Sequence, residues 1–381
     1  MKNAYEVIVV GAGTMGMAAG YYLARQKRKV LLLDAFSPPH TYGSHHGDTR
    51  INRHAYSMAA QYVPMALRAQ QLWDELAEES GQQIFLPTGV LRFGPADSAF
   101  LGRQLEMAGR FHIPVETLTA DEINRRWPGF RLPGNMGGNF EPRAGVLKCT
   151  EAIQAFRALA SGAGAVIRDN EPVRQIEIQQ DHVVVHSDQA RYHADKVIVS
   201  AGAWTKQLLS FLPIPVKIMR KTVGWFQAPE PLYQSEQFPA FIGEDENGVF
   251  YGFPCIARCG VKVGRHDGGQ ESDPDQLNRT FGAFPEDEGE LRQFLRSYLP
   301  QAEGALRNGS VCLYTMTPDE DFIIDHHPEH RHVLIATGFS GHGFKFSSVV
   351  GEILSDLITA NQTEFDLSPF GLHRFLPNRS E

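Results

Sequence analysis

Residues 11–16 (GAGTMG) form a glycine-rich motif of the kind that can hold the diphosphate of a dinucleotide. The motif follows a β-branched run at 5–10, opens a helical pattern at 14–26, and precedes a second apolar run at 29–34 that ends in Asp34. The glycines permit a tight turn close to the diphosphate, and the carboxylate can accept hydrogen bonds from a ribose hydroxyl. The first 34 residues therefore predict a β-α-β nucleotide-binding unit, but the motif alone does not separate FAD from NAD.

Two later segments place polar side chains among glycines. Residues 44–54 contain two arginines and three histidines, and from the residues alone a solvated basic loop and a ligand-binding loop are equal alternatives. Residues 338–345 (GFSGHGFK) follow a buried-strand pattern ending at Ala336, so their backbone N–H groups could surround the polar edge of a ligand. The alternative for this second segment is a glycine-rich turn without a ligand.

Three patterns are similar to metal or thiol sites but have simpler explanations. Residues 326–330 (HHPEH) match a zinc-peptidase string that acts on a helix, which Pro328 would break, so we predict a polar turn between strands. Cys255 and Cys259 lack a second ligand pair with tetrahedral spacing, so no metal site is predicted. Cys312 lies in an apolar strand pattern, where a buried inert thiol is the ordinary interpretation.

Composition excludes several classes of protein. The 381 residues carry 36 Lys+Arg against 44 Asp+Glu, a net charge of −8, which argues against a nucleic-acid partner. The longest apolar runs are far shorter than the roughly 20 residues of a membrane span, and the N-terminal residues lack the pattern of a signal peptide. We therefore expect a cytoplasmic protein with no membrane partner, whose four cysteines stay reduced.

The elements that must position these residues change in character along the chain. A long loop is expected at 35–60, and an amphipathic helix at 62–79. Short strand patterns begin near residue 84. From a predicted helix at 149–160 onward, the pattern of the nucleotide-binding domain resumes. Alternating strands return over 217–314, and a buried strand and a closing helix end the chain. Further predicted helices are at 97–110, from the capping box at 119–122, and at 286–298. Two interleaved domains are expected.

The order and spacing of these pieces resemble the monomeric sarcosine oxidase family, with the N-methyltryptophan oxidases as close relatives. The resemblance covers about residues 5–375. The segments that carry it are 9–21, 43–50, 251–254, 312–314, 321–325 and 338–347.

This resemblance implies a fold of the α/β class, α+β overall. It consists of a doubly wound, Rossmann-like FAD-binding domain with an inserted antiparallel-sheet substrate domain. The implied boundaries are 1–83, 148–216 and 316–381 for the FAD-binding domain, and 84–147 and 217–315 for the substrate domain.

The resemblance also implies roles for single residues. Cys312 would bind FAD covalently through its sulfur, and Arg53 and Lys345 would hold the substrate carboxylate, as a guanidinium fork and a point charge can do around one planar anion. Lys262 and Arg50 would lie on opposite faces of the flavin, with Lys262 activating oxygen because a fixed cation stabilises the superoxide charge. The implied catalytic residues are Lys262, Arg50, His266, Tyr251 and Tyr314, of which Tyr251 and His266 also line the substrate cavity. The implied cofactor contacts are Cys312, Gly11, Gly13, Gly16, Asp34, Ser44, His45, Arg50, Val173, Gly341 and Lys345.

The implied reaction is oxidative demethylation of sarcosine to glycine and formaldehyde, with O₂ reduced to H₂O₂ by a monomeric enzyme. Alternatives are an oxidase of N-methyl-L-tryptophan or another secondary amino acid, an FAD-linked dehydrogenase that passes electrons to a carrier, and a non-catalytic flavoprotein. An NAD-dependent dehydrogenase ranks below these.

Some positions depart from the family pattern. Residues 56–60 (YSMAA) lack the Gly-Glu-Gly pattern expected there, Asn52 replaces an aliphatic residue, and Ile242 stands at a variable position. These positions should border the substrate cavity, so they bear on which side chain the enzyme accepts.

Overall fold

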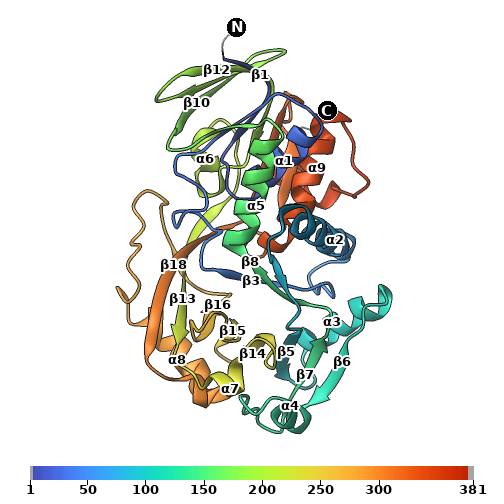
Figure 1. The fold of residues 1–381 in the computed structure, drawn as a ribbon, viewed down its shortest axis with the longest axis vertical. Coiled ribbons are helices and arrows are strands. Elements are labelled where there is room, and N and C mark those ends of the chain that lie inside the picture. Colours follow the sequence, from blue (N-terminus) through green and yellow to red (C-terminus); the bar gives the residue numbers. More distant parts are fainter. Residues whose placement is uncertain (1–2, 376–381) are drawn as a thin grey trace.

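The computed structural model describes residues 3–375, which build two large β-sheets joined by a small third one. In Figure 1 the first sheet and its long helices occupy the upper part of the molecule and the second sheet the lower part.

The first sheet has eight strands in the order β10-β11-β12-β1-β2-β9, with β20 paired to β12 and β19 to β20. The pairs among β1, β2, β9, β12 and β20 are parallel, whereas the hairpins β10–β11, β11–β12 and β19–β20 are antiparallel. Its strands are β1 (Ala4–Val10), β2 (Val30–Leu33), β9 (Val166–Arg168), β10 (Val173–Ile178), β11 (Val183–Ser187), β12 (Arg191–Val199), β19 (Ile323–His326) and β20 (Val333–Thr337).

The long helices cover one face of this sheet: α1 (Thr14–Arg25), α2 (Tyr62–Ser80), α5 (Cys149–Gly162) and α9 (Ser347–Thr359). Small residues let α1 and α9 approach closely, since a Cβ at Gly351 would lie 2.5 Å from the Cβ of Ala18. On the other face, Ile8 and Val10 pack in a cluster with residues of the β10–β11 hairpin and of the segment after α6 (Thr205–Leu208).

The second sheet has nine strands in the order β17-β13-β16-β15-β14-β5-β7-β6, with β18 paired to β13. The expected antiparallel arrangement holds for every pair except β5–β14, which is parallel. This pair joins the two inserted stretches of chain, so no hairpin dictates its direction. The strands are β5 (Val90–Pro95), β6 (Glu116–Thr119), β7 (Met136–Glu141), β13 (Lys217–Phe226), β14 (Ala240–Asp245), β15 (Gly248–Phe253), β16 (Val261–Arg265), β17 (Gln270–Glu271) and β18 (Leu306–Met316).

One face of the second sheet carries an aromatic core that includes Phe93, Phe241 and Phe250 together with Phe294 of α8 (Glu286–Tyr298). The remaining helices around this sheet are α3 (Ala99–Arg110), α4 (Ala120–Arg126) and α7 (Glu230–Tyr233). The capping box predicted at the start of α4 is present, with the Thr119 and Glu122 side chains each accepting from the other's backbone N–H. The opposite face of the sheet carries the candidate active-site residues described below.

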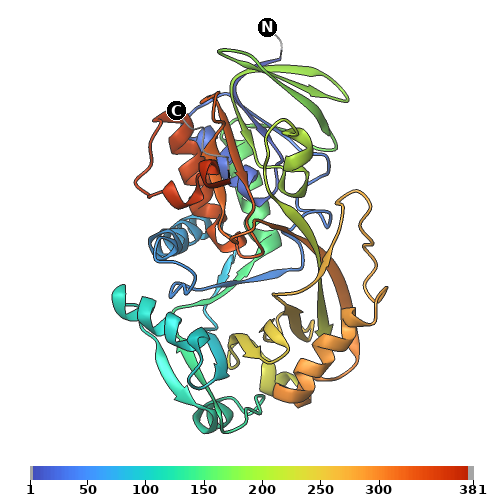
Figure 2. The ribbon, with the colours of Figure 1, turned by 180° about the vertical axis from the view of Figure 1, so that it is seen from behind.

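The small sheet lies between the two large ones and consists of β3 (Thr49–Asn52), β4 (Phe85–Leu86) and β8 (Gly145–Lys148). Its strands connect the upper and lower parts, as the view from behind in Figure 2 also shows. The expectation of a long loop over 35–60 was wrong at residues 49–52, because β3 pairs there with β8. The segment 327–332 is a turn between β19 and β20, as predicted. Within residues 3–375, no helix is both long and apolar enough to cross a bilayer.

Candidate active site

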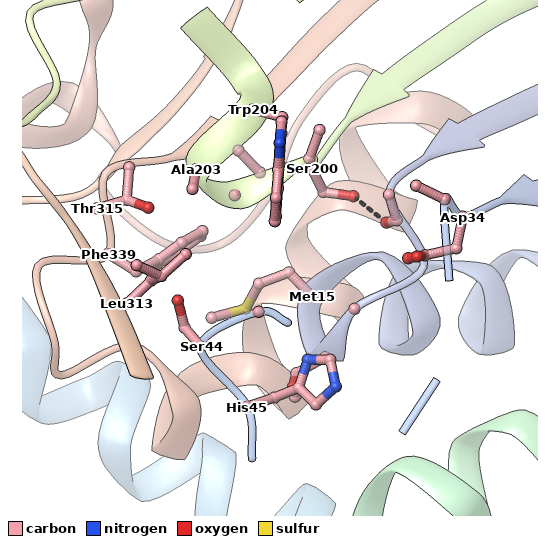
Figure 3. Close-up of a pocket in the computed structure, with 18 of the residues that line it drawn as sticks. Met15, Asp34, Ser44, His45, Ser200, Ala203, Trp204, Leu313, Thr315 and Phe339 are labelled. Carbon is pink, nitrogen blue, oxygen red and sulfur yellow. Dashed lines mark hydrogen bonds between the residues drawn. The ribbon is translucent and has the colours of Figure 1, made fainter. Parts of the chain in front are cut away.

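The glycine-rich turn after β1 leaves its backbone open toward a cavity. Gly11 has a φ of +91°, and a Cβ there would lie 2.6 Å from the Ser200 carbonyl oxygen. The Ser200 hydroxyl donates to the Gly11 carbonyl at 2.8 Å (Figure 3). A Cβ at Gly16 would lie 2.0 Å from the Gly11 carbonyl oxygen, so this glycine allows α1 to begin close to the turn. Only glycine fits at Gly11 and Gly16, as the nucleotide-binding prediction requires.

A cavity of about 480 Å³ extends from this turn toward the second sheet. The Asp34 carboxylate stands at its edge and accepts from the backbone N–H groups of Ala12 at 2.8 Å and Phe36 at 2.9 Å (Figure 3). The predicted cofactor contacts that line the cavity are Gly11, Gly13, Asp34, Ser44, His45, Arg50, Val173 and Gly341. Gly16, Cys312 and Lys345 do not line it themselves, although Leu313 and Phe344 do.

His45 presents an uncharged donor near the glycine-rich turn. Its Nε2 accepts from the backbone N–H of His40 at 3.1 Å, so the neutral ring carries its proton on Nδ1. Burial lowers the pKa of His45 well below its ordinary value, with the nearby His40, His46 and Arg50 adding to the effect. Nδ1 lies near Gly13, since a Cβ there would be 3.6 Å from it. An N–H group so placed can donate to an anion bound along the turn.

Arg50 and Lys262 both hold the segment 44–49 by donating to its backbone carbonyls. The Arg50 guanidinium donates to the carbonyls of Ser44 at 2.7 Å and of His46 at 2.8 Å. Lys262 donates to the carbonyls of Gly47 and Thr49 and lies 4.6 Å from the Phe253 ring centroid. Burial, followed by the positive charge of Arg50, lowers the pKa of Lys262 to about 7. Lys262 is thus a buried cation whose pKa lies near neutrality.

One face of the second sheet carries most of the predicted active-site residues, because strand side chains alternate between faces. In-register pairs share a face, and the pairs Phe253–Lys262, Trp225–Lys262 and Lys221–Cys312 link the strands β15, β16, β13 and β18. Residues two apart then share that face. The residues on it are Lys221, Trp225, Tyr251, Phe253, Lys262, His266, Cys312 and Tyr314.

The polar groups on this face contact one another. Tyr251 and Tyr314 interact through their side chains, and burial raises the pKa of Tyr251 to about 12. The ring centroids of Tyr314 and His266 are 5.8 Å apart. Burial, followed by the charges of Lys221, Lys345 and other nearby cations, lowers the pKa of His266 to about 4. His266 is therefore neutral at pH 7. Burial also raises the pKa of the Cys312 thiol.

A second cluster consists of Arg53, Tyr56, His342 and Lys345, and Tyr56 contacts the other three. Arg53 lies over the Tyr56 ring at 4.2 Å from its centroid, and the Lys345 ammonium lies 5.2 Å from the same centroid. His342 lies 3.0 Å from the Glu320 carbonyl through Nε2, which must be the donor, so Nδ1 accepts from the Tyr56 hydroxyl at 2.6 Å. Burial, followed by Arg53 and Arg50, lowers the pKa of Lys345 well below its usual range.

Glu141 of β7 fixes the backbone that presents Arg53. This carboxylate is fully buried and accepts from the N–H groups of His54 at 2.8 Å and Ala55 at 3.1 Å. Its Oε1 also lies 2.7 Å from Nδ1 of His54. A residue of the second sheet therefore positions Arg53, which follows β3 of the small sheet.

The buried cations of the site are held by uncharged oxygens. Arg53 donates to the carbonyl of Ala55 and Lys345 to that of His342. By contrast, the equally buried Arg220 donates to the Asp287 carboxylate at 2.8 Å. Burying a charge without a counter-ion is costly, so a cluster of cations held in this way indicates that the counter-ions are supplied by bound anions.

Sequence reasoning missed three residues that organise the site. Tyr56 and His342 position the two cations, and both lie in segments already singled out, although nothing in their types distinguished them from neighbours. Lys221 donates to the carbonyls of His266, Asp267 and Gly268 at 2.6–2.8 Å and so fixes the turn that bears His266. Its sequence context, one lysine in an alternating strand pattern, did not indicate a role in the site.

Comparison with known proteins gives the site its context. The model of the family "FAD dependent oxidoreductase" matches residues 6–357. The chain is 52% identical to the monomeric sarcosine oxidase of Bacillus sp. (strain B-0618) over 378 residues, 98% of this chain and 97% of that one. It is 44% identical to the N-methyl-L-tryptophan oxidase of Salmonella heidelberg (strain SL476) over 372 residues, 97% of this chain and 99% of that one.

Solved structures share the fold at lower sequence identity. NikD, an unusual amino acid oxidase essential for nikkomycin biosynthesis, superposes with a TM-score of 0.86 over 97% of both chains at 24% identity. Glycine oxidase from Geobacillus kaustophilus gives a TM-score of 0.84 over 98% of this chain and 100% of that one at 22% identity.

Proposed function

The chain belongs to the FAD-dependent oxidoreductase family, and within it to the group of sarcosine and N-methyltryptophan oxidases, and from this premise we propose that it demethylates sarcosine oxidatively. Sarcosine, O₂ and water would give glycine, formaldehyde and H₂O₂. The enzyme is an oxidoreductase, and its substrate is a small secondary amino acid.

The observation that carries this proposal is the pair Arg53 and Lys345 over one tyrosine ring, buried and, among the described residues, without a carboxylate partner. A guanidinium fork and an ammonium around one space fit the carboxylate of an amino acid. His266 and Tyr314 contact each other near these cations, so the amine end of such a substrate would meet neutral polar groups.

The charges of the site also prepare the substrate. Nearby cations disfavour a further positive charge, so they lower the pKa of an amine bound among them. A secondary amine held beside Arg53, Lys345 and Arg50 would therefore lose its ammonium proton more readily than in water. The neutral amine, with its lone pair free, is the form that can be oxidised.

The residues around the 480 Å³ cavity fit FAD, and FAD supplies the two-electron chemistry and the reaction with O₂ when it is bound. The open backbone at Gly11 and the His45 Nδ1–H suit the diphosphate, and Asp34 suits the ribose. We assign Cys312 as the covalent attachment point and Lys262 as the cation that promotes the reaction with oxygen. Both lie on the sheet face that bears Tyr251 and Tyr314.

The division into domains and the cellular setting remain part of the proposal. We assign residues 1–83, 148–216 and 316–381 to FAD binding, and 84–147 and 217–315 to substrate binding. We also propose a cytoplasmic monomer.

The test is H₂O₂ production by purified protein with sarcosine and, separately, with N-methyl-L-tryptophan. We expect a larger kcat/KM for sarcosine, in line with 52% identity to a sarcosine oxidase against 44% to an N-methyl-L-tryptophan oxidase. A larger value for N-methyl-L-tryptophan would replace the proposed substrate. Rapid anaerobic reduction of the flavin by sarcosine with slow reoxidation in air would instead indicate a carrier-linked dehydrogenase.

A further inference from the structure

Arg92 of β5 lies on the sheet face that carries the candidate active site. It is in register with Ile242 of β14, which is in register with Tyr251 of β15. In-register residues share a face, so Arg92 stands in one row with Tyr251, two strands away, at about 10 Å between Cα atoms. Its neighbours Leu91 and Phe93 point to the opposite face, into the aromatic core. Arg92 therefore points toward the site rather than away from it.

The Arg92 side chain is buried but incompletely paired. Its exposed fraction is 6%, and its guanidinium carbon lies 3.5 Å from the Phe100 ring centroid. One nitrogen donates to the Ser57 hydroxyl at 2.6 Å, and within residues 3–375 the Nε atom has no hydrogen-bond partner and the guanidinium forms no ion pair. A guanidinium has five N–H donors, so most of its capacity is free.

The charged groups around Arg92 do not supply a counter-ion. Burial, followed by the charge of Arg53, lowers the pKa of Arg92, while Glu244 and Tyr56 act in the opposite direction and Arg103 adds to the lowering. Arg92 adjoins the substrate end of the site through Ser57, which follows Tyr56, whose ring centroid lies 4.2 Å from the Arg53 guanidinium carbon. The Arg220–Asp287 pair shows how this fold satisfies an arginine that has a structural role, and Arg92 is not satisfied in that way.

We propose that Arg92 is a specificity-determining residue that binds a second carboxylate on the substrate, so that the preferred substrate is a dicarboxylic secondary amino acid. This inference rests on the proposed function and refines its substrate class: Arg53 and Lys345 hold the α-carboxylate, and Arg92 holds the distal one. The distal carboxylate can sit on the side chain, as in N-methyl-L-aspartate and N-methyl-L-glutamate, or on the amine substituent, as in iminodiacetate.

The loop that departs from the family pattern supports this assignment. Ser57 belongs to that loop and is the hydrogen-bond partner of Arg92. Ile242, which stands at a variable position, is the in-register neighbour of Arg92 on β14. Two of the three positions noted in the sequence thus lie beside Arg92, one through its guanidinium and one through its backbone.

The experiment compares kcat/KM for sarcosine, N-methyl-L-aspartate, N-methyl-L-glutamate and iminodiacetate in the holoenzyme and in two variants, Arg92→Gln and Arg92→Met. We expect one of the three dicarboxylates to exceed sarcosine, and each Arg92 variant to lose roughly 10- to 100-fold with it, the range for a hydrogen-bonded charge. Activity with sarcosine should change by less than about threefold. The preferred dicarboxylate tells whether the second charge sits on the side chain or on the nitrogen. Flavin content and Tm establish that the variants are folded.

The matched control is Ser57→Ala, which removes the hydroxyl that Arg92 contacts but leaves its charge. If Arg92 only braced the loop, Ser57→Ala and both Arg92 variants would lower activity with sarcosine and dicarboxylates alike, and the inference would be overturned. The inference would also be overturned if the parent enzyme had a kcat/KM for sarcosine at least as large as for every dicarboxylate, and if the Arg92 variants left the ratio of these values unchanged.

A binding measurement separates this inference from the proposed function. Titration of the flavin spectrum with succinate, glutarate and acetate needs no turnover. We expect the dicarboxylates to bind more tightly than acetate, and Arg92→Gln to abolish the difference. If no amine reduces the flavin, the proposed function fails, while this titration still decides whether Arg92 binds a second carboxylate. Equal affinity for acetate and the dicarboxylates in the parent enzyme would refute it.

Discussion

Replacing Lys262 with Met should slow the reaction of the reduced enzyme with O₂ far more than its reduction by substrate. Met fills similar volume and suits the contacts that Lys262 makes with the Phe253 and Trp225 rings, at 4.6 and 5.3 Å. The variant therefore removes a charge and its hydrogen bonds with little change in packing.

The magnitude follows from the surroundings of the ammonium. Lys262 is 1% exposed, and its donors are directed at the carbonyls of Gly47 and Thr49. At an effective dielectric constant of about 20, a unit charge about 4 Å away is worth about 4 kcal/mol, or about 10³-fold in rate. Because the charge of Arg50 remains nearby in the variant, we expect a loss of roughly 10²- to 10³-fold.

The assay is stopped-flow, with anaerobic reduction by sarcosine and reoxidation by O₂ measured separately. Because the pKa of Lys262 lies at about 7, the charged form dominates below that pH. The reoxidation rate constant of the parent enzyme should therefore fall as the pH rises through about 7, and that of the variant should be low and independent of pH. Lys217→Met, which changes an exposed lysine on β13, serves as the control for loss of any lysine charge. Equal slowing of both half-reactions in Lys262→Met would refute the role in oxygen activation.

Three further predictions test other parts of the site. Cys312→Ala should yield protein whose flavin is released on acid precipitation, and flavin that stays with the pellet would contradict the covalent attachment. Arg53→Gln should weaken sarcosine binding, measured by anaerobic spectral titration, by roughly 10- to 100-fold, and an unchanged Kd would remove Arg53 from carboxylate binding. Burial lowers the pKa of Lys221 to about 8 in the folded state from 10.5, so the unfolded state binds more protons between these values and the free energy of unfolding should rise with pH across that window, by at most about 3 kcal/mol. Lys221→Met should flatten this rise in urea titrations, and a parent protein without the rise would disprove it.

The nucleotide-binding unit could be predicted from the sequence because its parts are local. Residues 4–33 contain a strand, a glycine turn, a helix and a second strand, and each has its own pattern. The parallel pairing of β5 with β14 could not be predicted, because it joins strands distant in the chain with no connecting hairpin. β3 was missed inside the loop 35–60 for a related reason: its partner β8 lies almost a hundred residues later.

The site residues of the second sheet could not be predicted from the alternating pattern that identifies its strands. A polar residue at every second position ordinarily marks the face of a strand that meets water. By that rule Lys221, Lys262 and Arg92 are solvent-facing, yet each is less than 7% exposed. The rule fails because other segments cover all three side chains. The turn at 266–268 covers Lys221, the segment 47–49 covers Lys262, and Phe100 of α3 together with Ser57 covers Arg92. Lys262 could be assigned only by resemblance to a family, and the other two only from the structure.

Because that face is buried, its cations are little screened by water and can interact strongly with a bound ligand. On an open sheet, water would screen Arg92, Lys262 and Arg53, and each would be worth little to a ligand. Buried beneath neighbouring segments, and without acidic partners in the part of the chain that the structure describes, they retain strong fields around the candidate site. The fold uses Asp287 to neutralise Arg220 outside this space, whereas the cations within it are held by carbonyl and hydroxyl oxygens. We therefore expect this face to favour anionic ligands, with the number and placement of its cations setting which anions bind.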